Sequence, residues 1–397
     1  MDGGAPAPSE RGFETGALDL KRQPCVLYGA DLRMALPEVV RERSWRRVLP
    51  VVTPSLAGAP VVGEALARLG PGASEPFTRL KPHTPFDVVL DLAARIRETR
   101  ADAIAVVGGG SAIDAVKIAA LAAGAGVEDA AGLLALRAHV DADGMQRPSP
   151  GVRTNTAILA VPTTLSGAEF GLIAGATVAG IKHLYRADTL APDVVLYDPG
   201  LALRTPLDLW LSTGIRAVDH AAETVLSRDA NPFTDALALR ALALLRWGLE
   251  AALGDPGDYS ARHEGQLGVW LAAAGIGRVR YGASHGLGHQ LGAVAGVPHG
   301  ITSCVLLPAV LAFNGTVAPQ RQRLIAMALG RPEATAAEAV RDLIVGLGLP
   351  SRISDLGVAP GDLTRIAETS LGNAFVRANL RPITGVGDLM IILDAAQ

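Results

Sequence analysis

The amino-acid sequence predicts an α/β domain with a mostly parallel sheet over residues 23–200, followed by an all-α domain over residues 201–397. Two observations predict this order. In the first part, short β-branched runs alternate with helical patterns, which is typical of a parallel sheet covered by helices. Beyond Pro206, long Ala- and Leu-rich stretches with a 3.6-residue period replace the strand pattern. Residues 1–22 are rich in Gly, Pro, Ser and charge, and we expect a poorly ordered arm there.

The elements of the first part follow from these patterns. The apolar, β-branched runs predict strands at Cys25–Tyr28, Val48–Thr53, Ala103–Val107 and Ala157–Val161. Helical periodicity predicts helices at Phe86–Arg97 and Ser111–Ala123. The glycine-rich residues 167–180, together with Asp193–Tyr197, predict a hairpin that leads away from the sheet.

In the second part every predicted element is a helix. The 3.6-residue periodicity predicts helices at Leu207–Leu226, Thr234–Leu253, Tyr259–Ala274, Gln320–Leu329 and Thr335–Leu347. Single glycines and prolines fall between them, where caps and turns are expected.

Composition excludes several classes of function. The chain has 36 basic and 39 acidic residues and a net charge of −3, so neither nucleic acid nor a membrane surface is an expected partner. No apolar run approaches the roughly 20 residues of a membrane-spanning helix. The two cysteines, Cys25 and Cys304, lie far apart and predict neither a disulfide scaffold nor a thiolate zinc site. We expect a cytoplasmic protein that acts on a small molecule.

A glycine-rich turn is the first candidate for chemistry. Gly108, Gly109, Gly110 and Ser111 follow an apolar strand and open a helix that also carries Asp114. Glycines let the backbone approach a bulky anion, and the first amides of a helix offer unpaired donors, so this segment could hold a diphosphate. It is not the GxGxxG fingerprint, and a plain turn followed by a capped helix start remains the alternative.

Hydroxyl groups follow the next strand. Thr163, Thr164 and Leu165 come directly after Pro162, where a doubly wound sheet places its ligands outside the carboxyl edge. An ordinary ST-turn explains the same residues.

Histidines concentrate in the helical part. His285 and His289 are four residues apart and share one face of a helix, while His299 lies far enough along the chain to return from the start of a neighbouring helix. Together with His220 they could bind a divalent cation or relay a proton. The alternative for each is a structural histidine.

Seven segments together resemble the iron-containing alcohol dehydrogenase family, and within it the maleylacetate reductase branch. They are GGGSAIDAVK (108–117), VPTTLSGAE (161–169), YDPGLALRTP (197–206), GIRAVDHAAE (214–223), HGLGHQLGAVAGVPHG (285–300), LLPAVLAFN (306–314) and NLRPIT (379–384). The resemblance implies a dehydroquinate synthase-like fold, with a Rossmann-like domain, a helical domain and NAD(P)H in the cleft between them. Relatives also suggest a homodimer.

The resemblance assigns roles to individual residues. Cofactor binding falls on Gly108, Gly109, Gly110, Ser111, Asp114, Thr163, Thr164 and Leu165, with Thr53 at the end of the second strand. Since Thr53 stands where an acidic residue would favour NAD, NADPH is possible as well as NADH. His220, His285 and His299 fall on three metal-ligand positions for Fe or Zn, and His289 falls on the position that faces the nicotinamide and moves protons.

One position departs from the family pattern. The metal-binding members carry an aspartate four residues before the first histidine, and this chain has Arg216 there. A guanidinium cannot ligate a cation and would repel it, so these residues argue against a bound metal. Arg216 could instead bind a carboxylate or stabilise charge on an oxygen, or simply form an ion pair with Asp219.

The resulting hypothesis is an NAD(P)H-dependent reductase of an unsaturated or oxo carboxylic acid of the maleylacetate type. His289 would donate the proton, and Arg216 and His220 would position the substrate, with His285 and His299 beside them. Three alternatives stay open: a non-redox lyase or cyclase on the same fold, a metal-dependent alcohol dehydrogenase with Asp219 as a ligand, and a plain binding protein.

Overall fold

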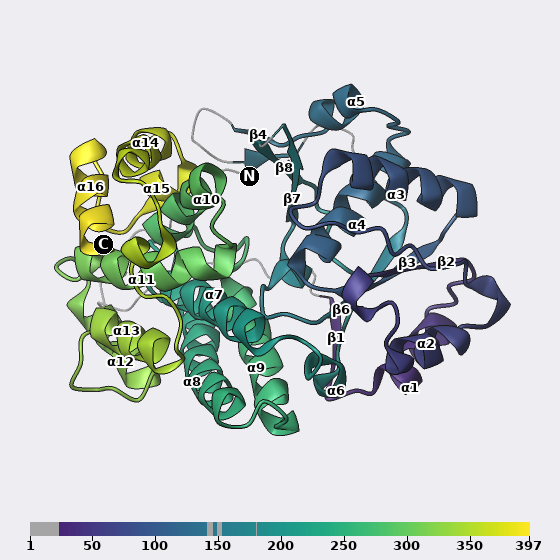
Figure 1. The fold of residues 1–397 in the computed structure, drawn as a ribbon, viewed down its shortest axis with the longest axis horizontal. Helices are drawn as coiled ribbons and strands as arrows, with labels where there is room; N and C mark the ends of the chain where they lie inside the picture. The colour runs from purple at the N-terminus through teal and green to yellow at the C-terminus, as the bar shows by residue number, and fades with distance from the viewer. Residues whose placement is uncertain (1–23, 141–145, 149–152, 180) are drawn as a thin grey trace, which may run out of the picture.

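The computed structural model describes residues 24–140, 146–148, 153–179 and 181–397, so the expected arm at residues 1–22 lies outside the described residues. Its main sheet has five parallel strands in the order β1-β9-β6-β3-β2 (Figure 1). The strands are β1 (Cys25–Tyr28), β2 (Val48–Val52), β3 (Ala103–Gly108), β6 (Ala157–Pro162) and β9 (Val194–Tyr197).

Helices cover both faces of this sheet. Along β3, Ile104 and Val106 pack into one core with α3 (Phe86–Thr99) and α4 (Gly110–Gly124). Ala105 and Val107 alternate with them and join the opposite core. That core contains α1 (Leu32–Glu42) and α2 (Pro60–Ala67). Because both faces are buried, the strands read as continuous apolar runs rather than as alternating ones.

The four strands predicted between residues 25 and 161 are confirmed. The predicted hairpin is wrong in one respect, because residues 193–197 do not belong to it. The hairpin pairs β7 (Ile173–Val178) with β8 (Ile181–Arg186) in an antiparallel two-stranded sheet. Residues 194–197 instead form β9, which lies between β1 and β6 in the main sheet. All four residues of β9 are buried, which explains its apolar sequence, whereas β8 carries charged residues that hid its strand pattern.

Short elements complete the first part of the chain. They are α5 (Ala130–Ala135), β4 (His139–Val140), β5 (Gln146–Arg147) and α6 (Pro199–Ala202).

The rest of the described chain is helical, as the sequence predicts. The helices are α7 (Leu207–Val225), α8 (Pro232–Gly254), α9 (Tyr259–Ala272), α10 (Ala283–Ala295), α11 (His299–Asn314), α12 (Pro319–Ala328), α13 (Ala336–Gly346), α14 (Pro360–Ser370), α15 (Ala374–Ala378) and α16 (Val386–Ala395). Residues of α7, α8, α9, α11, α12 and α13 share one hydrophobic core. A second core joins α10 and the other face of α11 to α14, α15 and α16.

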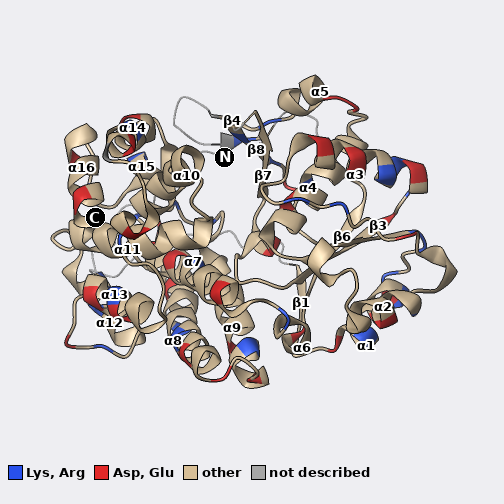
Figure 2. Ribbon diagram, in the orientation of Figure 1, with Lys and Arg blue, Asp and Glu red and all other residues tan. Residues whose placement is uncertain are grey.

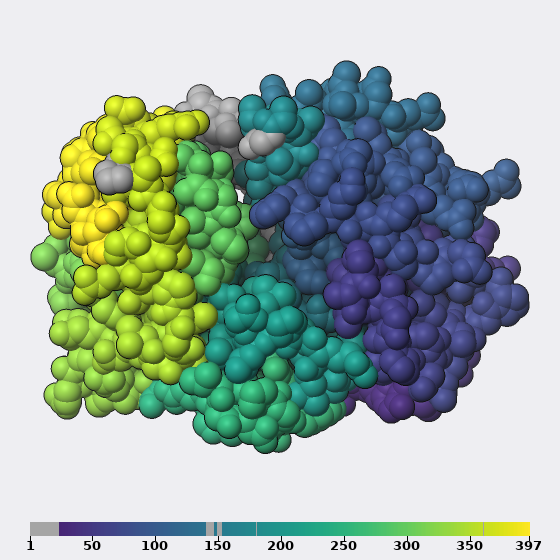
Figure 3. All heavy atoms as spheres, in the orientation of Figure 1, coloured from purple at the N-terminus to yellow at the C-terminus, as the bar shows by residue number. Residues whose placement is uncertain are grey.

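The two parts meet where α9 packs against α6 and β1, where Leu165 enters the core of the helical part, and where Lys182 of β8 contacts His299. Figure 3 shows a hollow in the surface where the green residues of the helical part face the blue and teal residues of the α/β part. Acidic and basic positions are interspersed over both parts (Figure 2), in keeping with the small net charge. Among the described residues, no helix combines the length and the apolarity that a membrane crossing requires.

Candidate active site

Three glycines join β3 to α4. A Cβ atom on Gly108 would lie 2.4 Å from Cγ2 of Thr53, and one on Gly110 would lie 2.7 Å from Oγ of Ser166. A side chain at either position would therefore push neighbouring loops apart. No side chain caps α4, and Ser111 in its first turn is exposed, so the first amides of this 15-residue helix are available to an anion.

The loop after β6 lies beside these glycines. A Cβ on Gly109 would lie 3.0 Å from Cγ2 of Thr164, and the amide of Thr163 donates to the carbonyl of Gly108 at 3.1 Å. The side chain of Leu165 is fully buried in the core of the helical part. The structure thus brings both threonines to the glycine turn, while the Leu165 side chain packs elsewhere.

Asp114 faces the hairpin rather than the glycine turn. Its Oδ2 accepts a hydrogen bond from the amide of Gly175 in β7 at 3.0 Å. Desolvation raises the pKa of Asp114, against the opposing charges of Lys182 and Lys117. The carboxylate therefore links α4 to β7.

The four predicted histidines come together from three helices as two contacting pairs. Nδ1 of His220 in α7 lies 3.0 Å from Nε2 of His285 in α10. The rings of His289 and His299 meet edge to face with centroids 5.8 Å apart. His299 is the first residue of α11, so the expected return at a helix start is confirmed. Phe375 contacts His285 and His289 and joins the two pairs.

Burial and nearby positive charge disfavour the charged form of all four histidines. Burial is the main cause that lowers the pKa of each, and all causes together lower the pKa of His289 to about 3. The charge of Arg216 lowers the pKa of all four further, and the charge of Lys182 lowers that of His289 and His299. The four rings are therefore neutral near pH 7 in the unliganded protein.

Arg216 and Asp219 form the ion pair that their spacing predicts, but this pair is buried. Nη1 of Arg216 lies 3.3 Å from Oδ2 of Asp219 and 3.1 Å from Oγ of Ser303. The same Oδ2 accepts from Ser303 at 2.6 Å and from Ser284 at 2.9 Å. The Arg216 side chain is 11% exposed and that of Asp219 is 0% exposed. Removing either partner would therefore leave a buried charge without compensation, which costs far more than breaking a surface pair.

Glu223 contacts His285 and was not among the predicted site residues. Its Oε2 lies 2.6 Å from Nδ1 of His285, and its two oxygens accept the amides of Gly282 and Ser284, each at 3.0 Å. A carboxylate there suits the positive end of α10. Burial and then the charge of Asp219 raise the pKa of Glu223 to about 8, while these amides oppose the shift. Its position three residues after His220, on the same side of α7, was the available signal.

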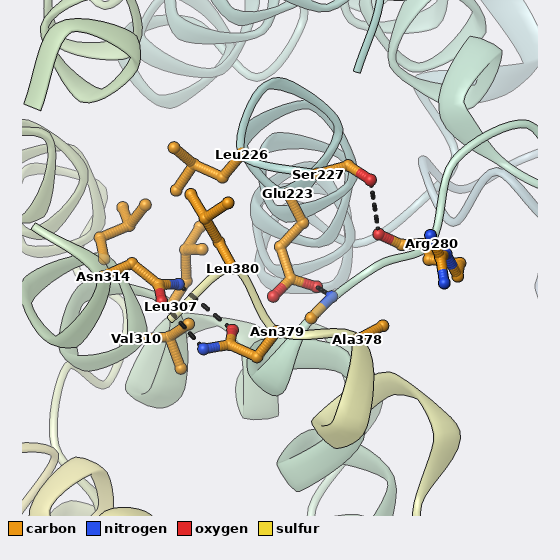
Figure 4. A pocket seen from close by; sticks show the side chains of 12 residues that line it. Glu223, Leu226, Ser227, Arg280, Leu307, Val310, Asn314, Ala378, Asn379 and Leu380 are labelled. Carbon is orange, nitrogen blue, oxygen red and sulfur yellow. Dashed lines mark hydrogen bonds between the residues drawn. The ribbon is translucent and has the colours of Figure 1, made fainter. Parts of the chain in front are cut away.

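The late NLRPIT segment supports the start of α10 from behind. Oδ1 of Asn379 accepts the amide of Ala283 at 3.1 Å, and the Asn379 side chain exchanges hydrogen bonds with Asn314. Figure 4 shows this amide pair and Glu223 around one small hollow. The segment therefore helps to hold the start of α10, the helix that carries His285 and His289.

Lys182 is a second residue that the sequence analysis missed. It lies on β8, and its Nζ is 3.1 Å from Nε2 of His299 across the two parts of the chain. The rarity of lysine in this chain was a weak signal, because only four of the 36 basic residues are lysines.

The comparisons with known proteins agree with this arrangement. Residues 24–199 match the iron-containing alcohol dehydrogenase family, and residues 210–396 match its C-terminal part. The chain is 30% identical to a maleylacetate reductase from Rhizobium sp. (strain MTP-10005), over 88% of this chain and 90% of that one. It is 31% identical to one from Sphingobium indicum, over 94% and 95%. The chain belongs to the iron-containing alcohol dehydrogenase family.

Solved structures of the family show the same fold. The crystal structure of maleylacetate reductase from Agrobacterium tumefaciens is 28% identical, with a TM-score of 0.81 over 96% of this chain and 98% of that one. The predicted fold, a Rossmann-like α/β part followed by a helical part, is therefore confirmed. Membership of the family makes the chain an NAD(P)-dependent oxidoreductase.

Proposed function

We propose that the chain is an NAD(P)H-dependent reductase of an unsaturated or oxo carboxylic acid of the maleylacetate type. The observation that carries the proposal is a buried guanidinium, that of Arg216, among four neutral histidines. Such a site suits an anionic substrate on which further negative charge develops during reduction. The curated relatives named above support the same substrate class.

The residues of the glycine turn fit a dinucleotide. Gly108 and Gly110 have no room for a Cβ, and the uncapped start of α4 offers amides to a diphosphate. Thr53, Thr163 and Thr164 surround the turn and would line the nucleotide site. Bound NAD(P)H would supply the hydride for the reduction.

The residues present do not fit the metal that the family name implies. Arg216 places a positive charge among the histidines, and Lys182 occupies Nε2 of His299. Within the described part of the chain, one group of potential metal ligands has its donor atoms within 4.8 Å of one another. This group is Asp219, Glu223 and His285, and not the three expected histidines. Oδ2 of Asp219 and both oxygens of Glu223 already accept hydrogen bonds from amides, serines and Arg216, whereas the buried Oδ1 of Asp219 has no hydrogen-bond partner among the described residues. The proposed reaction therefore uses no metal.

The side chains of the site have complementary tasks in this proposal. Of the three guanidinium nitrogens of Arg216, Nη1 alone has hydrogen-bond partners among the described residues. The other two nitrogens are therefore available to a carboxylate or to a developing oxyanion. His220 and His285 fix one wall of the site through their mutual hydrogen bond. His289 delivers a proton to the substrate. Burial is the main cause that favours its neutral form, and a bound carboxylate would offset the additional effect of Arg216 and Lys182 and so favour the protonated ring.

The assembly and location of the protein extend the proposal. We expect a homodimer in a reducing cytoplasm, with either NADH or NADPH as the reductant. Sedimentation analysis of the purified chain tests the dimer, and a monomer at micromolar concentration would contradict it.

The decisive experiment mixes purified protein with NADPH or NADH and maleylacetate, and follows the absorbance of the reduced nicotinamide. We expect oxidation that depends on the acid and survives treatment with a chelator. Failure to bind either nucleotide would overturn the proposal. Product formed without nucleotide would support the lyase or cyclase reading, and activity that disappears with the chelator and returns with Fe or Zn would support the metal-dependent alcohol dehydrogenase.

A further inference from the structure

Lys182 brings a positive charge from the α/β part to the histidines of the helical part. The β7–β8 hairpin that carries it lies between the main sheet and α10 (Figure 1). Its Nζ lies 3.1 Å from Nε2 of His299, the first residue of α11. The side chain thus reaches the place where the proposed cofactor and substrate would meet.

The hairpin is shaped to hold this side chain. Gly175 lies under the lysine stem, and a Cβ there would come 2.1 Å from Cε of Lys182. The amide of Gly175 in turn donates to Asp114, within the first turns of α4. Lys182 is therefore placed by the same helix that opens with the glycine turn.

Lys182 forms no ion pair within the described structure. Its hydrogen-bond partner is an imidazole, and no described carboxylate lies within ion-pair distance of its Nζ. Lys182 and Arg216 both act on His289 and His299, so two cations face the same pair of rings. Arg216 forms an ion pair with Asp219, whereas Lys182 acts on the buried carboxylate of Asp114 from beyond ion-pair distance. An exposed ammonium beside a buried basic cluster calls for an anionic ligand.

We propose that Lys182 selects acidic substrates by leaving His299 and pairing with a carboxylate of the substrate. This inference rests on the proposed function and names the residue that reads the substrate's charge. Arg216 remains fixed in the helical part, while Lys182 approaches from the opposite wall. A neutral carbonyl compound would leave the ammonium on His299 and gain nothing from it.

The test compares Lys182→Met with the wild type on maleylacetate and on its dimethyl ester. A hydrogen bond to a charged group contributes enough that we expect KM for the acid to rise about 10- to 100-fold, with little change in kcat. Turnover of the ester should change less than about 3-fold, because it carries no charge for the lysine to read. Lys182→Arg should recover most of the loss. Lys81→Met is the matched control, since Lys81 is an exposed lysine of the α/β part that pairs with Asp87.

A binding measurement separates this inference from the proposed function. Calorimetry of glutarate binding to the protein saturated with NADP⁺ should show the same weakening in Lys182→Met without any turnover. If the wild type binds glutarate through Lys182 but does not reduce maleylacetate, the proposed function fails and the inference stands. An unchanged KM for the acid in an active Lys182→Met enzyme would overturn the inference. A rise in KM for NAD(P)H alone would also overturn it, because the lysine would then bind the nucleotide.

Discussion

Replacing Arg216 by Met should destabilise the protein in a pH-dependent way. The change leaves the Asp219 carboxylate, which is 0% exposed, with two serine hydroxyls as its remaining donors. Breaking a buried ion pair costs about 3–5 kcal/mol, and the two hydroxyls place the expected loss near the lower end. Activity should fall by about 10²–10³-fold, which is the effect of removing one donor to a developing oxyanion.

The pH dependence follows from Asp219. Desolvation already raises its pKa, and loss of Arg216 removes the main cause that lowers it. A carboxyl whose folded pKa lies above its unfolded value stabilises the fold below the unfolded pKa, and this stability is lost as pH rises toward the folded pKa. The deficit of Arg216→Met should therefore be larger near about pH 8 than near about pH 5.

Urea unfolding followed by circular dichroism at both pH values measures this deficit. The control is Arg216→Met combined with Asp219→Asn, which removes both charges and should recover most of the stability. A single variant as stable as the wild type at both pH values, or a loss that does not change with pH, would refute the argument.

Three further predictions concern the glycine turn, α10 and the metal. Gly110→Ala should weaken NADPH binding about 10-fold in a fluorescence titration, because its Cβ would lie 2.7 Å from Oγ of Ser166; unchanged affinity would contradict the placement of the diphosphate. Glu223→Gln should lower the free energy of unfolding by about 1–3 kcal/mol in urea titrations, since an amide nitrogen would face the N–H groups at the start of α10; a stability equal to that of the wild type would rule this out. Elemental analysis should find no stoichiometric Fe or Zn in the active enzyme, whereas one tightly held ion per chain would show that Arg216 does not exclude it.

The main sheet and the helical part were predictable because their signals are local. Because β3 and its neighbours are buried on both faces of the sheet, their sequences are continuous apolar runs. The amphipathic helices, such as α7, show apolar residues with a 3.6-residue period. The helices α14, α15 and α16 were not predicted individually, and neither were α10 and α11. These five helices pack against one another in the second core, and α11 is buried on nearly every side, so it lacks the polar stripe of an amphipathic helix. The residues of β9 were assigned to the hairpin because a short buried run carries no information about its partner strand.

The candidate site was predictable where spacing determines contact. His285 and His289 share a helix face, and Arg216 and Asp219 meet within one turn of α7. Glu223 and Lys182 were missed because tertiary packing alone brings them to the histidines, over 62 and 117 residues of sequence. The burial of the Arg216–Asp219 pair was equally invisible in the sequence, although it decides what the pair contributes.

The contact between Asp114 and Gly175 has a kinetic consequence. In the proposed function, a dinucleotide bound at the start of α4 would restrain Asp114, and through it the strand against which the lysine stem lies. The acid would then meet a pre-arranged ammonium only after the nucleotide has arrived. Catalysis should consequently follow a compulsory order, with reduced nucleotide entering before the acid and oxidised nucleotide departing last.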